Sequence, residues 1–240
     1  MKLRIRHTKL GKIRFTSHRD TARHWERAVR KAGVPLAYSA GFTPRPRMSF
    51  GLALPTGAES FAEYLDMELA PDQTTELDEL CARFAAALPA GYDVTHVVPR
   101  DLGSPSLQED VVACTWRLTL HDVSPQQLLD AIDTTLAAAT LPVARERKGQ
   151  RSTDDVRPAI LDLSVDPSTD DPRPHLCAML ATNGRGLRPT ELMAAMFPAL
   201  DPVDTAARVL RTQQWIEREG VRREIIPATP VAPRTPVECA

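Results

Sequence analysis

The sequence contains no apolar run close to the roughly 18 residues that a membrane-spanning helix requires. Its first four residues lead directly into charged positions and lack the apolar core of a secretory signal peptide. These two absences argue against a membrane span and against export. We therefore expect a soluble, cytoplasmic protein that does not contact a membrane.

Cysteine is scarce and scattered. The four cysteines form no CxxC pair and no Cys/His spacing that suits a metal, so neither a zinc site nor a cysteine-ligated iron–sulfur cluster is predicted. We expect no metal, no cofactor, and reduced thiols at Cys81, Cys114, Cys177 and Cys239. Cys239 is the penultimate residue, whereas prenylation needs the cysteine fourth from the end, so no lipid anchor is expected.

Signatures of known enzyme classes are missing as well. The sequence has no GxSxG, no HExxH, no protein-kinase motif set and no Cys–His dyad. Five histidines are interpreted as surface or core residues rather than ligands: His7, His24, His96, His121 and His175. The sequence is therefore informative about architecture and partners and says little about a reaction.

The chain does contain enough material for a real core or for two domains, with 240 residues of which 42% are apolar and 25% charged. Its charge is segregated. Residues 1–50 hold 13 Lys and Arg against 2 acids, a balance of +11, and residues 51–110 hold 2 against 12, a balance of −10. Either the basic block faces a polyanion such as RNA, or it pairs internally with the acidic block.

Hydrophobic periodicity and turn residues predict a β-α-β-β-α-β order in the first half. The elements are a strand or tight hairpin at 2–16 bending at 9–11, a helix from Ser17 to about Ala32, an irregular strand or loop at 35–60, a strand at 61–69, a helix between Pro71 and Pro89, and a strand at 92–98. Ser17 and Asp20 resemble a capping box at the start of the first helix. In a ferredoxin-like sheet, Lys2, Arg4 and Arg6 would lie opposite Asp66 and Glu68 on one open face and pair with them.

The pattern restarts after a linker at 99–110. Its elements are a strand at 111–120, a helix at 125–139, strands at 141–146, 159–165 and 176–181, a helix at 189–197 and a final strand at 209–216. No residue-level repeat supports a duplication, so the pairing of the halves is argued from pattern alone. We predict an α+β fold of two ferredoxin-like halves packed in tandem, at 1–100 and 111–218, with a disordered proline-rich tail at 225–240.

Several short motifs in the first 70 residues are too particular to be generic. They lie at 15–20, 38–51, 54–57 and 63–66, and further matching stretches lie at 147–149, 155–158 and 186–189. With them the sequence resembles, over about residues 1–215, the bacterial radical-SAM-associated protein family, a domain of unknown function. Members are stand-alone chains or C-terminal extensions of cobalamin-binding-type radical SAM proteins, often encoded near a ribonuclease of the E/G type.

The resemblance implies a radical SAM protein as partner and no established reaction. This chain lacks the CxxxCxxC motif that would hold a radical SAM cluster. It is therefore not itself the radical enzyme.

Two candidate anion-binding features lie on the first predicted helix. At its start, free backbone N–H groups next to Ser17, His18 and Arg19 would suit a phosphate; a well-capped helix with a packed or solvated histidine is the alternative. Along its outer side run Arg19, Arg23, Arg27, Arg30 and Lys31. The like charges repel one another mildly, so a polyanion would relieve them, although a solvated face is the commoner outcome.

The loop after this helix is the third candidate. Tyr38, Phe42 and Phe50 alternate with Arg45 and Arg47, and single-stranded nucleic acid is commonly held by rings that stack on bases and by guanidinium groups that bind phosphates. Equally, the three rings could form the loop's own small core.

The second half offers a fourth candidate. Lys148 lies in a presumed hairpin with three arginines, and Arg185 and Arg188 stand among glycines before the predicted helix at 189. This spacing matches no P-loop or dinucleotide fingerprint, and a solvated turn is the competing interpretation.

The leading hypothesis is a non-enzymatic protein that binds transfer or ribosomal RNA, not DNA, and presents it to a radical SAM modification enzyme. One alternative is a metal-independent endoribonuclease, because tandem ferredoxin-like folds with a histidine near the first helix resemble the CRISPR repeat-processing enzymes. There His18 would be the acid or base, and Arg19 or Arg47 would stabilise the phosphorane. The other alternative is a protein-interaction module that docks the radical SAM partner.

Overall fold

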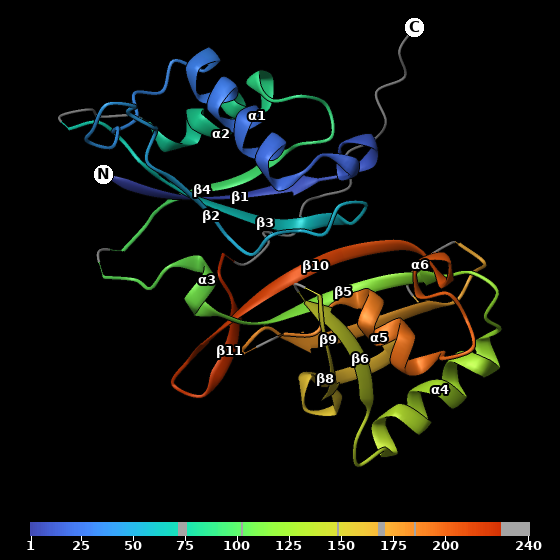
Figure 1. The fold of residues 1–240 in the computed structure, drawn as a ribbon. Helices are drawn as coiled ribbons and strands as arrows, with labels where there is room; N and C mark the ends of the chain where they lie inside the picture. Colours follow the sequence, from blue (N-terminus) through green and yellow to red (C-terminus); the bar gives the residue numbers. More distant parts are fainter. Residues whose placement is uncertain (72–75, 102, 148, 168–170, 185, 227–240) are drawn as a thin grey trace, which may run out of the picture.

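A computed structural model of the chain describes residues 1–71, 76–101, 103–147, 149–167, 171–184 and 186–226 (Figure 1). Its strands are β1 (Lys2–Lys9), β2 (Met48–Phe50), β3 (Glu59–Glu68), β4 (Val94–Pro99), β5 (Val111–Leu120), β6 (Pro142–Arg147), β7 (Gln150–Asp155), β8 (Ile160–Val165), β9 (His175–Ala181), β10 (Ala206–Arg218) and β11 (Val221–Glu224). Its helices are α1 (His18–Lys31), α2 (Leu77–Ala87), α3 (Leu107–Asp110), α4 (Pro125–Ala137), α5 (Pro189–Met196) and α6 (Pro202–Thr205), with 3-10 turns η1 (Gly11–Phe15) and η2 (Arg157–Ala159). The predicted α+β class is confirmed. In the described part of the chain, no helix is both long and apolar enough to cross a bilayer.

The first half consists of β1, α1, β2, β3, α2 and β4 in chain order, and its strands lie in the order β4-β1-β3-β2 with antiparallel pairings. α1 and α2 lie over one face of these strands (Figure 1). Trp25 and Val29 of α1 belong to the same buried cluster as Leu3 and Ile5 of β1. Removal of these apolar side chains from water holds α1 on the sheet.

α1 begins and ends close to the predicted positions. The Oγ atom of Ser17 accepts a hydrogen bond from the backbone N–H of Asp20 at 3.1 Å, which satisfies one of the free donors of the first turn. Gly33 follows the helix with a φ of +62°, in the left-handed region that glycine adopts at little cost.

The second half repeats the connectivity with an insertion. β5, α4, β8, β9, α5 and β10 follow one another, and the strands lie in the order β10-β5-β9-β8. The hairpin of β6 and β7 is inserted between α4 and β8 as a separate two-stranded sheet. Leu128 and Ile132 of α4 and Leu192 of α5 share a buried cluster with Trp116 and Leu118 of β5.

One sheet runs through both halves. β3 and β10 pair in parallel, with Leu210 beside Glu59 and Arg211 beside Ser60, so that nine strands form a single, mostly antiparallel sheet. The two halves were predicted in tandem, and the local sequence patterns contain no signal for this shared pairing. The ferredoxin-like assignment of each half and the boundaries at 1–100 and 111–218 stay predictions.

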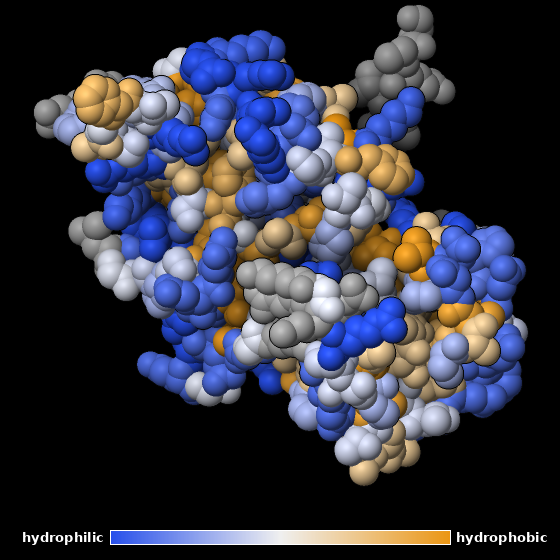
Figure 2. Space-filling view, in the orientation of Figure 1, coloured by the Kyte–Doolittle hydropathy of each residue, from blue (hydrophilic) through white to orange (hydrophobic). Residues whose placement is uncertain are grey.

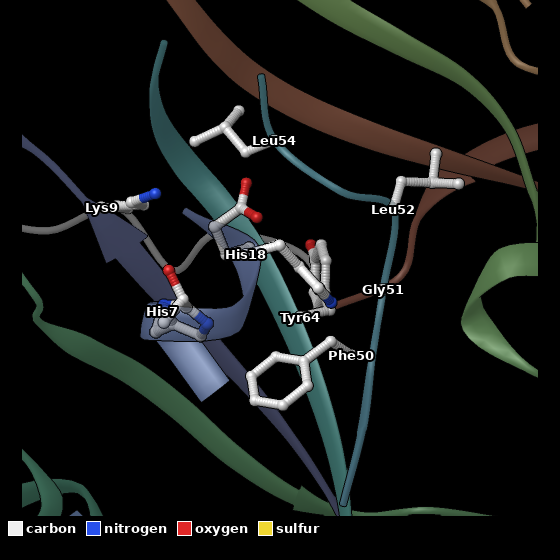
Figure 3. Close-up of a pocket in the computed structure, with 10 residues that line it drawn as sticks. His7, Lys9, His18, Phe50, Gly51, Leu52, Leu54 and Tyr64 are labelled. Atoms are coloured by element: carbon white, nitrogen blue, oxygen red, sulfur yellow. The ribbon is translucent and has the colours of Figure 1, made fainter. Parts of the chain in front are cut away.

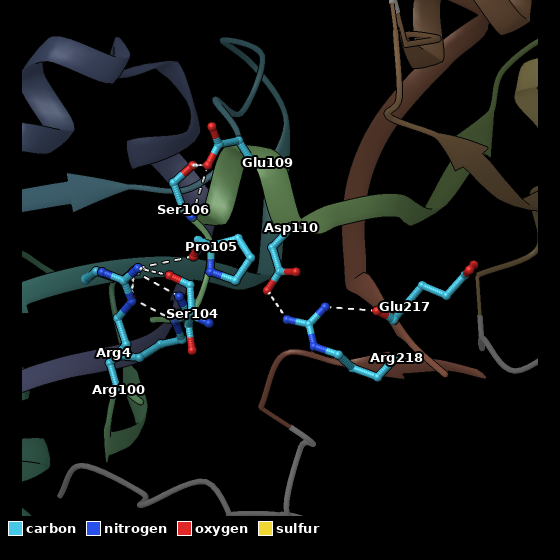
Figure 4. Close-up of polar contacts among 10 residues, drawn as sticks. Arg4, Arg100, Ser104, Pro105, Ser106, Glu109, Asp110, Glu217 and Arg218 are labelled. Carbon is cyan, nitrogen blue, oxygen red and sulfur yellow. Dashed lines mark hydrogen bonds and ion pairs between the residues drawn. The ribbon is translucent and has the colours of Figure 1, made fainter. Parts of the chain in front are cut away.

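Two predicted elements of the first half need correction. The second arm of the hairpin at 2–16 is the η1 turn, because Gly11 with a φ of +69° directs the chain away from β1 instead of back along it. The linker at 99–110 contains α3, which begins at Ser106 with the Oγ and backbone N–H of that residue both bonded to Glu109 (Figure 4).

The predicted tail at 225–240 begins inside the folded structure. β11 pairs with β10, and Ile226 lies in a small buried cluster with Tyr64 and Leu107. Burial of these apolar side chains stabilises the folded position of the segment, so residues 225–226 belong to the folded structure and not to the tail. Residues 227–240 lie outside the described residues.

The register predicted between β1 and β3 is confirmed, but the face that carries it is not open. Arg4 pairs with Asp66 through Nε–Oδ1 at 2.7 Å and Nη2–Oδ2 at 2.9 Å. Arg100 lies against the same carboxylate and donates to the carbonyl groups of Ser104 and Pro105 (Figure 4). Arg4 and Asp66 are buried, because the segment leading to α3 covers this face of the sheet.

Candidate functional site

The outer side of α1 is an exposed basic surface. Arg19, Arg23, Arg27, Arg30 and Lys31 are all exposed, and we call these five residues the α1 basic face. Among the described residues, only Arg23 of the five has a carboxylate within 4.0 Å, that of Asp20 at 3.3 Å. Figure 2 shows hydrophilic side chains gathered over α1, as the predicted amphipathic pattern requires.

The loop between α1 and β2 presents aromatic rings to solvent. Tyr38 pairs with Pro46 across its base, and the backbone N–H of Ser39 donates to the carbonyl of Arg45 at 2.9 Å. The closed base leaves Phe42 fully exposed at the tip and Tyr38 half exposed. These two rings do not form a core within the loop, which was the structural alternative for them. We call Tyr38, Phe42 and the exposed Arg45 the loop tip.

Arg47 and Phe50 lie away from the loop tip. Arg47 pairs with Glu68 of β3 at 3.2 Å and lines a groove that also contains Lys2, Asp66 and Arg100. Phe50 lies at the opposite end of β2 and is half buried against His18, with the two ring centroids 5.5 Å apart in an edge-on arrangement. The structure therefore separates residues that the sequence grouped as one loop.

A small cavity opens where α1 begins (Figure 3). Its wall contains His7 and Lys9 of β1, His18 and Thr21 of α1, Phe50 to Leu52 and Leu54 of the following segment, and Glu63 and Tyr64 of β3. The volume is about 20 Å³, which admits a water-sized group and excludes a nucleobase. The helix start predicted as a phosphate site thus lies beside an enclosed polar space.

The electrostatics of the cavity are set by burial. His7 is fully buried, and desolvation lowers the pKa of its imidazole below 6.5, with the nearby Glu63 acting in the opposite direction. Burial also lowers the pKa of Lys9. The Glu63 carboxylate is bonded by Arg211 of β10, whose Nη2 and Nε lie 2.5 and 3.1 Å from Oε1.

Four functional candidates were missed by sequence reasoning: His7, Lys9, Glu63 and Arg211. One signal was available, because His7 continues the inward positions of Leu3 and Ile5 on β1, and an inward histidine on a core-facing strand is unusual. Arg211 carried no such signal. It becomes relevant only because β10 pairs beside β3.

The second-half candidates do not join this site. Lys148 and Arg185 lie outside the described residues. Arg188 is exposed directly before α5, where its backbone N–H donates to Glu191 at 2.9 Å, and it borders a different pocket of about 280 Å³ between the halves. α5 belongs to the second half, whereas α1 covers the first (Figure 1). In the described part of the chain, no cluster of three His, Cys, Asp or Glu side chains is placed to hold a metal ion.

Comparison with known proteins connects the chain to one family. No curated protein matches the sequence. A family model described as an uncharacterized protein conserved in bacteria, DUF2344, matches residues 2–189, which include both the α1 basic face and the cavity. That description names no radical SAM partner and no RNA. The chain belongs to the DUF2344 family of uncharacterized bacterial proteins.

Proposed function

We propose that the protein binds single-stranded RNA along the α1 basic face and the loop tip, and that it presents this RNA to a radical SAM enzyme. The observation that supports RNA binding most directly is the exposure of four cations on α1 that have no carboxylate within 4.0 Å among the described residues, together with the exposed ring of Phe42. Guanidinium groups bind phosphates without reading sequence, and an exposed ring gives an unstacked base a surface.

The closed base of the loop favours this function over a loose surface loop. Two backbone hydrogen bonds, Ser39 to Arg45 and Arg47 to Ala37, hold the loop before any ligand is present. A loop whose backbone is already held at its base loses less entropy when one of its side chains binds a base. The proposal also keeps the ferredoxin-like interpretation of each half, which the strand order β4-β1-β3-β2 and its counterpart β10-β5-β9-β8 support.

The radical SAM partner and the choice of transfer or ribosomal RNA rest on the sequence resemblance alone. For the endoribonuclease alternative, one observation counts in favour: His18 borders the same cavity as the buried His7. Cleavage of a phosphodiester uses one general acid and one general base, and histidine is the side chain that most often serves in these roles. The docking alternative would use the same α1 basic face for a protein.

Fluorescence anisotropy with a labelled RNA, measured over a series of salt concentrations, tests the main proposal. We expect affinity to fall steeply with salt, and the triple variant Arg19→Gln, Arg27→Gln, Arg45→Gln to weaken binding and reduce the salt slope by about one unit for each lost contact. The double variant Arg222→Gln, Arg223→Gln, with two exposed arginines of β11 removed, is the matched control. Absence of binding at low salt would refute the proposal.

The same material separates the alternatives. Cleavage of the RNA without added metal that is lost in His18→Ala would support the endoribonuclease. Purification from native cells before and after nuclease treatment addresses the docking alternative, because a radical SAM protein that remains bound after nuclease does not depend on RNA.

A further inference from the structure

Lys9 is a buried cation without an acidic partner. Only 3% of its surface is exposed, and its ammonium group donates to the backbone carbonyl of Thr16 at 2.8 Å. Among the described residues no carboxylate oxygen lies within 4.0 Å of this ammonium group. Lysine is rarely buried unless it is paired, so this position calls for a counter-ion.

The charges around Lys9 do not balance. Glu63 is the carboxylate whose charge acts on Lys9. It is already bound by two N–H donors of Arg211, which is itself 1% exposed. His7 contributes no negative charge, and its lowered pKa keeps it neutral near pH 7. The cluster of Lys9, Arg211, Glu63 and His7 therefore retains one positive charge in excess, inside a region from which most water is excluded.

The start of α1 offers further N–H donors for an anion beside Lys9. The neutral His7 adds none, because its Nδ1 donates to the carbonyl of Thr8 at 3.1 Å and its Nε2 is then an acceptor. α1 is 14 residues long and begins at the cavity, and its first two N–H groups have no acceptor within the helix. The acid nearest to this helix start, Asp20, is already bonded to Ser17 and paired with Arg23.

The size of the cavity limits what enters it. A volume of about 20 Å³ holds one oxygen atom or one water molecule, so a larger ligand would remain at the mouth. His18 is exposed at this mouth, with its ring against Phe50 (Figure 3). An oxyanion on a larger group therefore fits the space, whereas a planar base does not.

We propose that this cavity is a phosphate-binding site in which one non-bridging oxygen enters toward the ammonium group of Lys9 while His18 and the start of α1 hold the remainder. If the ligand is a phosphodiester of RNA, the proposed site rests on the RNA-binding function proposed above and deepens it. If the ligand is free phosphate, the proposed site does not depend on that function. The source of the phosphate group is thus a separate question from the existence of the site.

Thermal unfolding with two probes tests the site. Inorganic phosphate and the dinucleotide UpU are titrated at constant ionic strength, with chloride as the balancing anion. We expect the melting temperature of the wild-type protein to rise with phosphate. Lys9→Met should raise the apparent dissociation constant by at least about tenfold, since it removes the buried charge. Lys12→Met, which changes an exposed lysine of the neighbouring η1 turn, should leave it unchanged.

A second readout distinguishes a binding role for Lys9 from a structural one. Without phosphate, Lys9→Met should be at least as stable as the wild type, because an unpaired buried charge has been replaced by an apolar side chain of similar length. If Lys9→Met does not fold, the variant His18→Asn is measured instead; His18 is exposed, and its substitution should weaken phosphate binding. A phosphate effect that is equal in all variants, or no effect at all, would overturn the site.

The results for phosphate and for RNA are independent. Stabilisation by phosphate in a protein that binds neither UpU nor RNA would keep the site and remove the RNA-binding function. RNA binding that is unchanged by Lys9→Met, combined with no response to phosphate, would keep the function and remove the site. Stabilisation by both probes that Lys9→Met abolishes supports a phosphodiester as the ligand.

Discussion

β1 and α1 both carry several cations, yet the two elements use them in opposite ways. Arg4 and Arg6 of β1 are buried and face the carboxylates of Asp66 and Glu224, whereas Arg19 and Arg27 of α1 are exposed with no carboxylate within 4.0 Å among the described residues. The comparison teaches that a segregated charge pattern can have two explanations in one chain. Internal pairing accounts for the cations of the strand, whereas among the described residues Arg19 and Arg27 of the helix have no such pairing.

The largest expected effect is on the strand side of this comparison. Asp66→Asn should destabilise the protein by about 3–5 kcal/mol, because the buried Arg4 and the half-buried Arg100 would lose their shared carboxylate. Urea unfolding measures the change. Glu68→Gln is the control, since its partner Arg47 is half exposed and the expected cost is below about 1 kcal/mol. Equal costs for the two variants would remove the distinction between buried and exposed pairs.

On the helix side, stability and affinity should separate. The double variant Arg19→Gln, Arg27→Gln should change the free energy of unfolding by less than about 0.5 kcal/mol, because both side chains are exposed. Its RNA affinity should nevertheless fall, with a salt slope about two units shallower. Urea unfolding and anisotropy on the same preparation measure both quantities. A double variant that is destabilised but keeps its RNA affinity would show that Arg19 and Arg27 stabilise the fold and do not bind RNA.

Phe42 extends the comparison to an uncharged residue of the proposed RNA-binding surface. Phe42→Ala should leave stability unchanged and weaken RNA binding by about 1–3 kcal/mol if a base stacks on the ring. Phe15→Ala is the matched control, because Phe15 is also an exposed phenylalanine but lies in the η1 turn. If both substitutions had the same effect on affinity, the ring of Phe42 would have no specific role.

The smallest expected effect concerns His7 on the buried side. Burial lowers the pKa of its imidazole below 6.5 in the folded state, so between that folded pKa and 6.5 the unfolded chain binds more protons. Stability should therefore fall as the pH falls below about 6.5, with a slope of at most about 1.4 kcal/mol per pH unit from this group. Melting temperatures of the wild type and His7→Leu between pH 5 and 8 measure it.

The variant His7→Leu should lose part of this dependence. It should keep the part due to His24 and His96, whose pKa values burial also lowers. An unchanged pH profile in His7→Leu would show that the histidine does not need to stay neutral in the folded protein.

Much of the fold could be predicted because local signals and the tertiary structure agree. The start of α1 at Ser17, the register of Arg4 with Asp66 and the strands of the second half follow from caps, alternation and turn residues. The pairing of β3 with β10 could not be predicted in this way, since Glu59 and Leu210 are far apart in sequence and carry no local sign of contact. The same holds for α3, whose four residues are too few to show a helical period.

The candidate site was predictable on its exposed side only. Arg19 was predicted from the amphipathic period of its helix, and Phe42 from the composition of its loop. Both signals are properties of a short stretch of chain. The cavity brings together Lys9, Glu63 and, through Glu63, Arg211, from three separate strands. Buried polar clusters of this kind depend on long-range register, which a single sequence does not display.

The pairing of β3 with β10 also determines when the protein can finish folding. During synthesis the first half leaves the ribosome long before residues 206–226 have been made. Until then Glu59 and Ser60 of β3 lack their partners on β10, the guanidinium of Arg6 lacks Glu224, and the hydroxyl of Tyr64 lacks the carbonyl of Ile226. An unpaired strand edge is where nascent chains associate wrongly. β10 and β11, which are synthesised after the first half, thus complete and protect its sheet.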